Sequence, residues 1–247
     1  MPAFLVRPED VQDQRLVLRA AEVSHLVQVR RHRVGQEIEV IDGRGLSYHV
    51  CIATIERDMV FCQILERRES SGESAVQLSL APALLKGQRF DFVVEKATEI
   101  GVSRIVPLLS ERGVVKPGSG NKLERWQRLA GAAAKQCGRS HLPAIELPAP
   151  FGEVIKTFRE ENDQVLMATP GLPGRSVRQV LKDGNCRRLG LLIGPEGGFA
   201  TREQELAKEA GVELFSWAGR ILRADTASIV LGALVLHESE QNLRTEE

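Results

Sequence analysis

Apolar and polar residues alternate regularly between Gln36 and about Arg68. The segment QEIEVIDGRGLSYHVCIATIE has this alternation on both sides of Asp42-Gly43, a dipeptide typical of the turn in a two-stranded hairpin. MVFCQIL follows and has the pattern of a further strand. The pattern therefore predicts a small sheet or barrel in the N-terminal part of the chain, and the small polar residues of ESSGESA (69–75) predict a linker after it.

Beyond this linker, short apolar runs alternate with segments of helical spacing. The expected strands are AVQLSLAPAL (75–84), SRIVPLLS (103–110), DQVLMATP (163–170), RRLGLLIG (187–194) and VELFSWA (212–218). The expected helices are residues 87–100, 123–138, 201–211 and 226–237. We expect the third helix to begin at a capping box of Thr201 with Gln204 and to end near Gly211. Strands that alternate with helices predict an α/β domain with a largely parallel sheet, so we divide the chain into a β domain (1–72) and an α/β domain (73–247).

Composition narrows the class of protein. Of the 247 residues 43% are hydrophobic, enough for a sizeable core. Lys+Arg and Asp+Glu number 33 each, so no global positive field attracts nucleic acid and any RNA binding must come from local patches. No apolar run approaches the roughly 20 residues of a membrane span, and the N-terminus MPAFLVRPED lacks the apolar stretch of a signal peptide. We therefore expect a cytoplasmic protein without membrane contact.

The cysteines do not indicate a metal site. Cys51, Cys62, Cys137 and Cys186 lie far apart, form no C-x-x-C pair and are not accompanied by clustered histidines. We expect reduced, buried thiols and no bound metal.

Candidate binding loops follow three of the predicted strands: MATPG (167–171), IGPEGG (193–198) and WAGRILRADTA (217–227). Ligands of parallel α/β sheets bind at the carboxyl ends of strands, where these loops lie. Neither G-x-x-x-x-G-K-[ST] nor G-x-G-x-x-G occurs, so the ligand is not held like the phosphates of ATP or NAD. Taken alone, the glycines of GPEGG indicate either a tight turn or a backbone that approaches a ligand closely.

Three segments together resemble a known family. In order along the chain, behind a small β domain, they are KGQRFDFVVEKATEIGVSRIVPL, IGPEGGF and RILRADTA. They are similar to the bacterial ribosomal RNA small subunit methyltransferase E family, and the similarity extends over nearly the whole chain. The resemblance implies a PUA-like N-terminal β-barrel domain that binds RNA. It also implies a SPOUT-type α/β domain with a trefoil knot near its C-terminus, which binds S-adenosylmethionine (AdoMet). Family members act as homodimers and methylate N3 of a uridine in 16S rRNA, so we expect this activity on the assembled small ribosomal subunit.

The resemblance also assigns residues to the cofactor pocket. Those expected to line it are Thr169, Gly194, Glu196, Gly197, Gly198, Trp217, Leu222 and Thr226. The chain departs from the family where RILR is usually followed by Thr-Glu and here by Ala224 and Asp225. It departs again where Leu-Gly-Pro is usual and here Trp217, Ala218 and Gly219 stand. Asp in place of Glu keeps the charge but shortens its reach.

Methylation at N3 of uracil requires that the imide proton be removed or that the resulting anion be stabilised. Arg220 and Arg223 are candidate donors to the uracil oxygens, where negative charge develops. Asp225 and Glu196 are candidate general bases, and each has an alternative role. Asp225 would instead cap the final helix, and Glu196 would instead accept hydrogen bonds that hold its loop. A third possibility is that neither acts as a base.

The expected RNA contacts are arginines and one lysine, namely Arg7, Arg30, Arg31, Arg33, Lys86, Arg112 and Arg139. The first 75 residues hold 10 arginines, no lysine and 12 acidic residues, so only local clustering makes a basic surface there. The apolar final helix TASIVLGALVLH is expected in a core or at a homodimer contact.

Two other functions are compatible with such a fold. One is a non-catalytic RNA-binding or ribosome-assembly protein that kept the fold and lost turnover. The other is a SPOUT methyltransferase with another RNA target, such as a tRNA ribose. The intact GPEGG and RILRADTA segments favour an enzyme, because bulky or charged replacements there would block the cofactor pocket.

Overall fold

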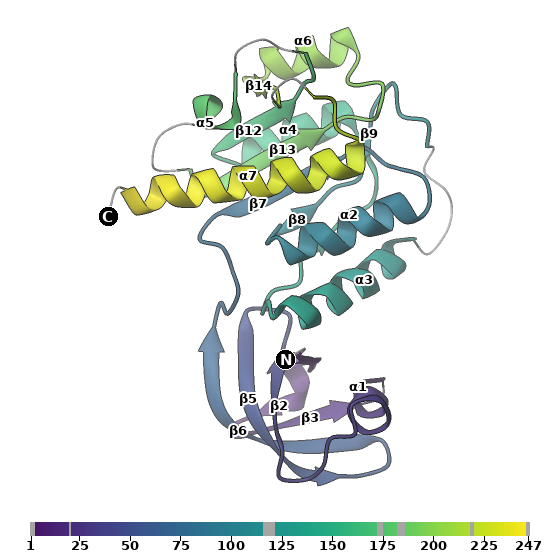
Figure 1. Cartoon of the computed structure of the whole chain (residues 1–247), viewed down its shortest axis with the longest axis vertical. Helices are drawn as coiled ribbons and strands as arrows, with labels where there is room; N and C mark the ends of the chain where they lie inside the picture. The colour runs from purple at the N-terminus through teal and green to yellow at the C-terminus, as the bar shows by residue number, and fades with distance from the viewer. Residues whose placement is uncertain are drawn as a thin grey trace. The chain divides into compact units, whose positions relative to one another are not determined.

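The computed structural model describes residues 3–19, 21–115, 122–171, 175–181, 186–217 and 220–245 (Figure 1). The chain divides into two compact units, the first made of residues 1–73 and 131–142 and the second of residues 74–130 and 143–247. Each unit has its own hydrophobic core.

The first unit contains a six-stranded sheet with the strand order β1-β4-β5-β6-β3-β2. Its neighbours are antiparallel except for the parallel pair β1 and β4. The hairpin predicted around Asp42-Gly43 is confirmed, because β4 and β5 pair in antiparallel register from Ile41 opposite Ser47. The sequence pattern did not reveal β3 or the short helices of this unit. The elements are β1 (Phe4–Leu5), η1 (Pro8–Asp10), β2 (Val11–Gln12), β3 (Arg15–Arg19), α1 (Ala21–Ser24), η2 (His25–Val29), β4 (Glu37–Ile41), β5 (Leu46–Ile55) and β6 (Met59–Glu69).

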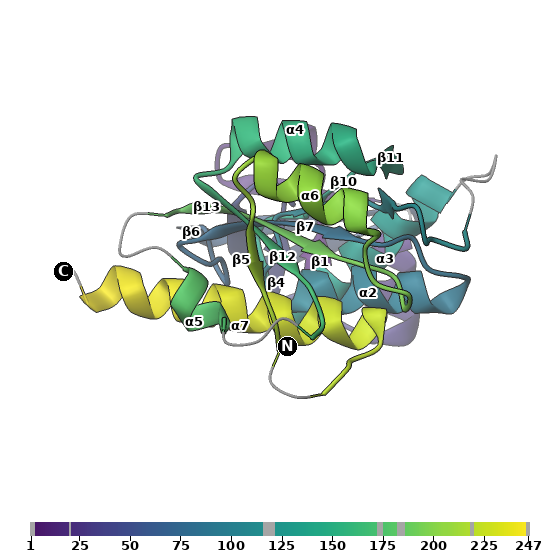
Figure 2. The same cartoon turned by 90° about the horizontal axis from the view of Figure 1, so that it is seen from above.

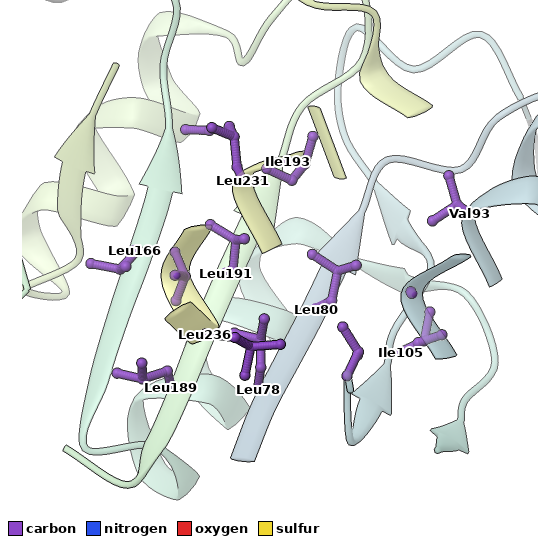
Figure 3. Close-up of a cluster of buried hydrophobic side chains, with 14 of the residues drawn as sticks. Leu78, Leu80, Val93, Ile105, Leu166, Leu189, Leu191, Ile193, Leu231 and Leu236 are labelled. Atoms are coloured by element: carbon purple, nitrogen blue, oxygen red, sulfur yellow. The ribbon is translucent and has the colours of Figure 1, made fainter. Parts of the chain in front are cut away.

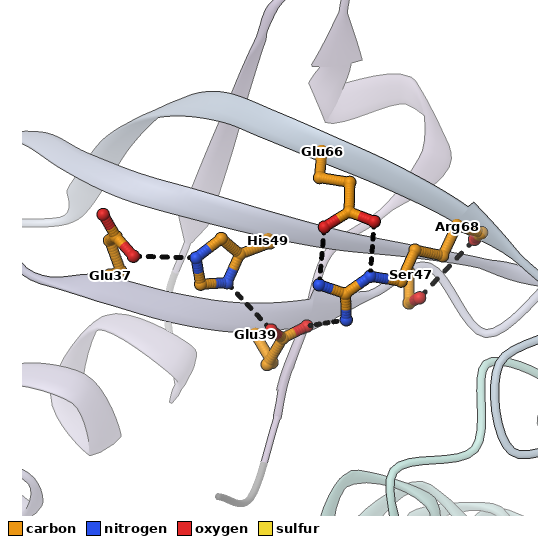
Figure 4. Close-up of polar contacts among 6 residues, drawn as sticks. All are labelled: Glu37, Glu39, Ser47, His49, Glu66 and Arg68. Carbon is orange, nitrogen blue, oxygen red and sulfur yellow. Dashed lines mark hydrogen bonds and ion pairs between the residues drawn. The ribbon is translucent and has the colours of Figure 1, made fainter.

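Charged side chains from three strands of this sheet form a network (Figure 4). His49 on β5 lies 2.8 Å from both Glu37 and Glu39 on β4. On β6, Arg68 pairs with Glu66 at 2.7 Å. The pKa of His49 is raised because Glu37 and then Glu39 accept hydrogen bonds from its ring. The charges of the three carboxylates are therefore largely offset by His49 and Arg68.

The second unit contains the predicted parallel sheet, with six strands in the order β10-β8-β7-β13-β12-β14 and every neighbouring pair parallel. Figure 2 shows α4 and α6 on one side of this sheet and α2, α5 and α7 on the other. The strands are β7 (Gln77–Pro82), β8 (Arg104–Ile105), β9 (Leu108–Leu109), β10 (Ala144–Ile145), β11 (Ala149–Pro150), β12 (Gln164–Ala168), β13 (Arg188–Ile193) and β14 (Glu213–Phe215). The helices are α2 (Gln88–Glu99), α3 (Lys122–Cys137), α4 (Phe151–Glu161), α5 (Val177–Val180), α6 (Thr201–Glu209) and α7 (Ala224–Thr245), and the residues of α3 from 131 onward count with the first unit.

Helices cover both faces of the central strands, which explains their apolar composition. All five residues of β12 are buried, and so are five of the six residues of β13. A parallel strand with two covered faces has nearly continuous apolar residues instead of alternation. Figure 3 shows Leu80, Leu166 and Leu191 of the strands in one cluster with Leu231 and Leu236 of α7. The core thereby fixes the strand ends on which the candidate loops are mounted.

The structure corrects three local predictions. SRIVPLLS is not one strand, because β8 pairs with β7 and β9 pairs with β11 in a separate two-stranded sheet. Pro107 stands between these strands and has no N–H to continue a ladder. The capping box of Thr201 is wrong, because Ala200 precedes α6 and donates its N–H to Glu203 at 2.8 Å. We expected four buried thiols, but only Cys62 is buried; Cys51 and Cys186 are partly exposed and Cys137 is exposed.

The search for metal sites and membrane spans covers the described residues alone. Among them, no group of three or more His, Cys, Asp or Glu side chains is placed to hold a metal ion. No helix within the same residues is long and apolar enough to cross a membrane.

Candidate functional site

The three candidate loops lie at one edge of the parallel sheet, because they follow neighbouring strands. In the sheet order, β13 lies beside β12, and β12 lies beside β14. Thr169 follows β12, Gly194 follows β13, and Trp217 lies two residues beyond β14. The backbone N–H of Thr169 donates to the carbonyl of Phe215 at 2.8 Å, which ties the first loop to the third. Parallel strands therefore bring together loops that are distant in the sequence.

The glycine loop after β13 contains a tight turn. The N–H of Gly198 donates to the carbonyl of Pro195 at 2.8 Å, which closes the turn, and Gly198 has a φ of +66°. That left-handed conformation favours glycine. A Cβ on Gly194 would lie 3.1 Å from the ring of Phe199, closer than an ordinary contact. The two interpretations of GPEGG, a tight turn and a ligand-binding loop, are therefore compatible, because the loop turns tightly and its residues also line a pocket.

A pocket lies between these loops and the start of α7. It is lined by Ala168, Thr169, Pro170, Ile193, Gly194, Pro195, Glu196, Gly198, Trp217, Arg220, Ile221, Leu222, Ala224, Ala227 and Leu231. Six of the eight residues expected at the cofactor are in this lining, and Gly197 and Thr226 are not. Gly197 and Thr226 are both exposed to solvent next to lining residues. Two residues of the third loop, Ala218 and Gly219, lie outside the described residues.

Two polar atoms of the pocket are buried without a hydrogen-bond partner among the described residues: Thr169 Oγ1 and Trp217 Nε1. Thr169 is only 7% exposed. Buried polar groups are nearly always paired in folded proteins, so two unpartnered polar atoms on residues of one pocket are compatible with a polar ligand there. AdoMet fits this lining, because its ribose and the edge of its adenine offer hydrogen-bonding groups and the faces of the adenine ring offer apolar surface to Ala227 and Leu231.

The two candidate bases share one cation that the sequence analysis missed. Arg89 Nη1 lies 2.5 Å from Glu196 Oε1, and Arg89 Nε lies 2.8 Å from Asp225 Oδ2. Arg89 is the second residue of α2, within the KGQRFDF segment that carries the resemblance. The sequence offered no sign that this arginine would meet one carboxylate from the glycine loop and another from the first turn of α7.

Both carboxylates are held in the ionised form. The pKa of Asp225 is lowered first by the hydrogen bond from Arg89, against a smaller opposing effect of burial. The pKa of Glu196 is lowered first by its own backbone N–H, and the guanidinium of Arg89 lowers it further. A carboxylate with a lowered pKa is a weaker base, which argues against both as proton acceptors. Asp225 is also not a cap, because α7 begins at Ala224 and Asp225 lies within its first turn.

The structure places the two candidate donors differently. Arg220 lines the pocket and is exposed, so it is available to contact a bound ligand. Arg223 is exposed as well but is not part of the lining.

Six of the seven expected RNA contacts are exposed: Arg7, Arg30, Arg31, Arg33, Lys86 and Arg112. Arg112 Nη1 donates to the carbonyl of Gly197 at 2.8 Å, so this arginine lies against the glycine loop. Arg139 differs, because it is 3% exposed and pairs with Glu73 at 2.8 Å inside the first unit. Its buried position argues against the RNA contact that we expected, and we assign Arg139 to packing.

Comparisons with known proteins agree with this geometry. The family described as RNA methyltransferase domain matches residues 72–236, and the family described as RNA methyltransferase PUA domain matches residues 18–65. The second match confirms the prediction of a PUA-like N-terminal domain.

Named relatives cover most of the chain. Ribosomal RNA small subunit methyltransferase E of Synechocystis is 34% identical over 92% of this chain and 74% of its own length. The protein of the same name from Bacillus subtilis is 25% identical over 89% of this chain and 88% of its own. The crystal structure of ribosomal RNA small subunit methyltransferase E from Neisseria gonorrhoeae, bound to S-adenosyl methionine, superimposes with a TM-score of 0.80 at 29% identity and covers 96% of this chain and 97% of its own. The chain therefore belongs to the ribosomal RNA small subunit methyltransferase E family.

Proposed function

We propose that this chain transfers the methyl group of AdoMet to N3 of a uridine in 16S rRNA, on the assembled small ribosomal subunit. The observation that carries the proposal is the pocket at the ends of β12, β13 and β14, where Thr169 and Trp217 present buried polar atoms without partners. The names of the relatives and the S-adenosyl methionine bound by the Neisseria gonorrhoeae protein support the same activity.

The cofactor is held by the pocket lining in this proposal. Thr169 and Trp217 bind its polar groups, and the backbone of Gly194 and Gly198 approaches it closely because neither residue carries a Cβ. Leu222 adds apolar contact. AdoMet, when bound, supplies an electrophilic methyl group on a sulfonium centre.

The chain's own contribution to the reaction is position and charge. Arg220 donates hydrogen bonds to a uracil oxygen and stabilises the negative charge that develops there, and Arg223 is the second candidate for this role. Glu196 and Asp225 do not remove the N3 proton, because both are paired with Arg89 and have lowered pKa values. The proton leaves to water once the arginine field has made the imide more acidic.

RNA is bound by exposed basic residues of both units in this proposal. Arg30, Arg31 and Arg33 cluster after η2 in the first unit. Arg112 is well placed for the same purpose in the second unit, because it contacts the glycine loop.

We also propose a homodimer that works in the cytoplasm, where ribosomal subunits are assembled. Ile221 supports the dimer, because this apolar side chain of the pocket lining is 81% exposed and would be stabilised by burial against a second copy. Sedimentation at a series of concentrations tests the assembly. The trefoil knot implied by the resemblance stays a prediction.

The test of the activity uses labelled AdoMet and small ribosomal subunits that lack their own modification, followed by nucleoside digestion and mass spectrometry. Label in 3-methyluridine is the expected result. Label on a ribose 2′-hydroxyl or on another base would refute the proposed specificity. Binding of RNA without binding of AdoMet or transfer would refute the enzyme and favour the non-catalytic RNA-binding protein.

A further inference from the structure

Two segments that line the pocket are joined by a single side chain outside its lining. Glu196 belongs to the glycine loop after β13, and Asp225 belongs to the first turn of α7. Arg89 of α2 pairs with Glu196 through Nη1 at 2.5 Å and with Asp225 through Nε at 2.8 Å. Arg89 itself is not among the lining residues. Among the described residues, these two ion pairs link Arg89 to the segments that form the pocket.

The two carboxylates do not hold this arrangement by themselves. Asp225 is close enough to Glu196 for its negative charge to oppose ionisation of Glu196. Without a cation between them, like charges would push the glycine loop and the start of α7 apart. The guanidinium offsets this repulsion, since its planar fork presents separate nitrogens to separate partners. Hydrogen bonds between ionised groups are roughly twice as strong as neutral ones.

Resting on the function proposed above, we propose that Arg89 is a positioning residue of the cofactor pocket. Its simultaneous pairs with Glu196 and Asp225 fix the glycine loop against the first turn of α7. The two carboxylates are then anchors for the arginine. This explains why acidic residues stand beside a pocket in which neither is suited to accept a proton.

The side chain of Arg89 is 40% exposed, so contact with RNA phosphate is the competing role. The two roles differ in what they change. A phosphate contact affects RNA affinity and its salt dependence and leaves AdoMet affinity intact. A positioning role affects AdoMet affinity in the absence of RNA.

The test measures AdoMet binding by calorimetry, without RNA, for Arg89→Gln, Arg89→Lys and the control Arg125→Gln. Arg125 on α3 is a matched control. It pairs at 2.7 Å with Asp91, which lies in the first turn of α2 like Arg89, and it is not among the lining residues. We expect the AdoMet affinity of Arg89→Gln to fall by roughly tenfold or more, because two charge-assisted hydrogen bonds are lost. The AdoMet affinity of Arg89→Lys should lie between those of the unaltered chain and Arg89→Gln, because a single ammonium group cannot present separate nitrogens to the two carboxylates as a guanidinium does.

The control should bind AdoMet like the unaltered chain. Far-UV circular dichroism and thermal unfolding confirm that each variant is folded. Arg89→Gln with unchanged AdoMet affinity would overturn the proposal, and so would an equal loss in Arg125→Gln. If the unaltered chain fails to bind AdoMet, the proposed function itself fails, which is a different result.

A double-mutant cycle supplies an independent test. Asp225→Asn removes one anchor without altering a lining residue. If Arg89 and Asp225 act as a unit, the variant with both changes binds AdoMet no more weakly than Arg89→Gln alone, because the second change also removes the charge that repels Glu196. Losses that simply add would show that the two residues act separately, which contradicts the proposal.

Discussion

Replacing Thr169 with valine separates a ligand-binding role from a structural one. Thr169 is 7% exposed, and its hydroxyl has no partner among the described residues. A buried polar group without a partner costs about 1–3 kcal/mol, and valine has nearly the same shape without the hydroxyl. The hydrogen bond from the backbone N–H of Thr169 to Phe215 remains in the variant. We therefore expect the free energy of unfolding to rise by about 1 kcal/mol in the absence of AdoMet.

AdoMet binding should respond in the opposite direction. A neutral hydrogen bond contributes about 0.5–1.5 kcal/mol net, which corresponds to a loss of affinity of roughly twofold to tenfold. Urea unfolding measures the stability, and calorimetry measures the affinity.

The matched control is Thr98→Val, the same substitution at a fully buried residue whose hydroxyl donates to the carbonyl of Val94 at 2.8 Å. It should destabilise the protein by about 1 kcal/mol, because a satisfied hydrogen bond is lost. It should not alter AdoMet affinity. A Thr169→Val variant that is destabilised like the control and binds AdoMet as tightly as the unaltered chain would refute the reasoning.

Two further predictions concern other parts of the chain. Gly194→Ala should weaken AdoMet binding and lower the free energy of unfolding by about 1 kcal/mol, because the new Cβ would lie 3.1 Å from the Phe199 ring. Calorimetry measures the binding and urea unfolding measures the stability. Unchanged values of both would contradict this prediction. The raised pKa of His49 contributes stability that is complete below its ordinary value of 6.5 and is lost as pH rises through the higher folded-state pKa. Urea midpoints should therefore fall more between about pH 6 and about pH 9 in the unaltered chain than in His49→Gln. The variant lacks the titrating ring next to Glu37 and Glu39. Parallel curves for the two proteins would show that these ion pairs add no stability.

The positions of strands and helices could be predicted from the sequence to a large extent, because their patterns depend on residues close together in the chain. The apolar run of β13 indicated a strand, and the glycines after it indicated where the chain turns. Helix α4 (Phe151–Glu161) was missed even though Phe151, Val154, Ile155 and Phe158 are spaced on one buried face. That omission was not forced by the sequence, since the helical period was present.

The candidate pocket could be located only as three separate loops. That these loops meet depends on the strand order β13-β12-β14, which differs from the order along the chain. The order follows from packing among segments far apart in sequence, and local periodicity does not report it. The family resemblance supplied pocket residues that periodicity alone would not have selected.

The class of fold, the alternation of strands and helices, and the glycine loop follow from the sequence, because they depend on hydrophobic spacing and on backbone freedom at a few positions. Which charges meet depends on the tertiary structure. It brought Arg89 to Glu196 and Asp225, and it buried Arg139 against Glu73. The physical reason is that an ion pair depends on distance in space, and an arginine has the same appearance in the sequence whether it faces solvent, RNA or a carboxylate.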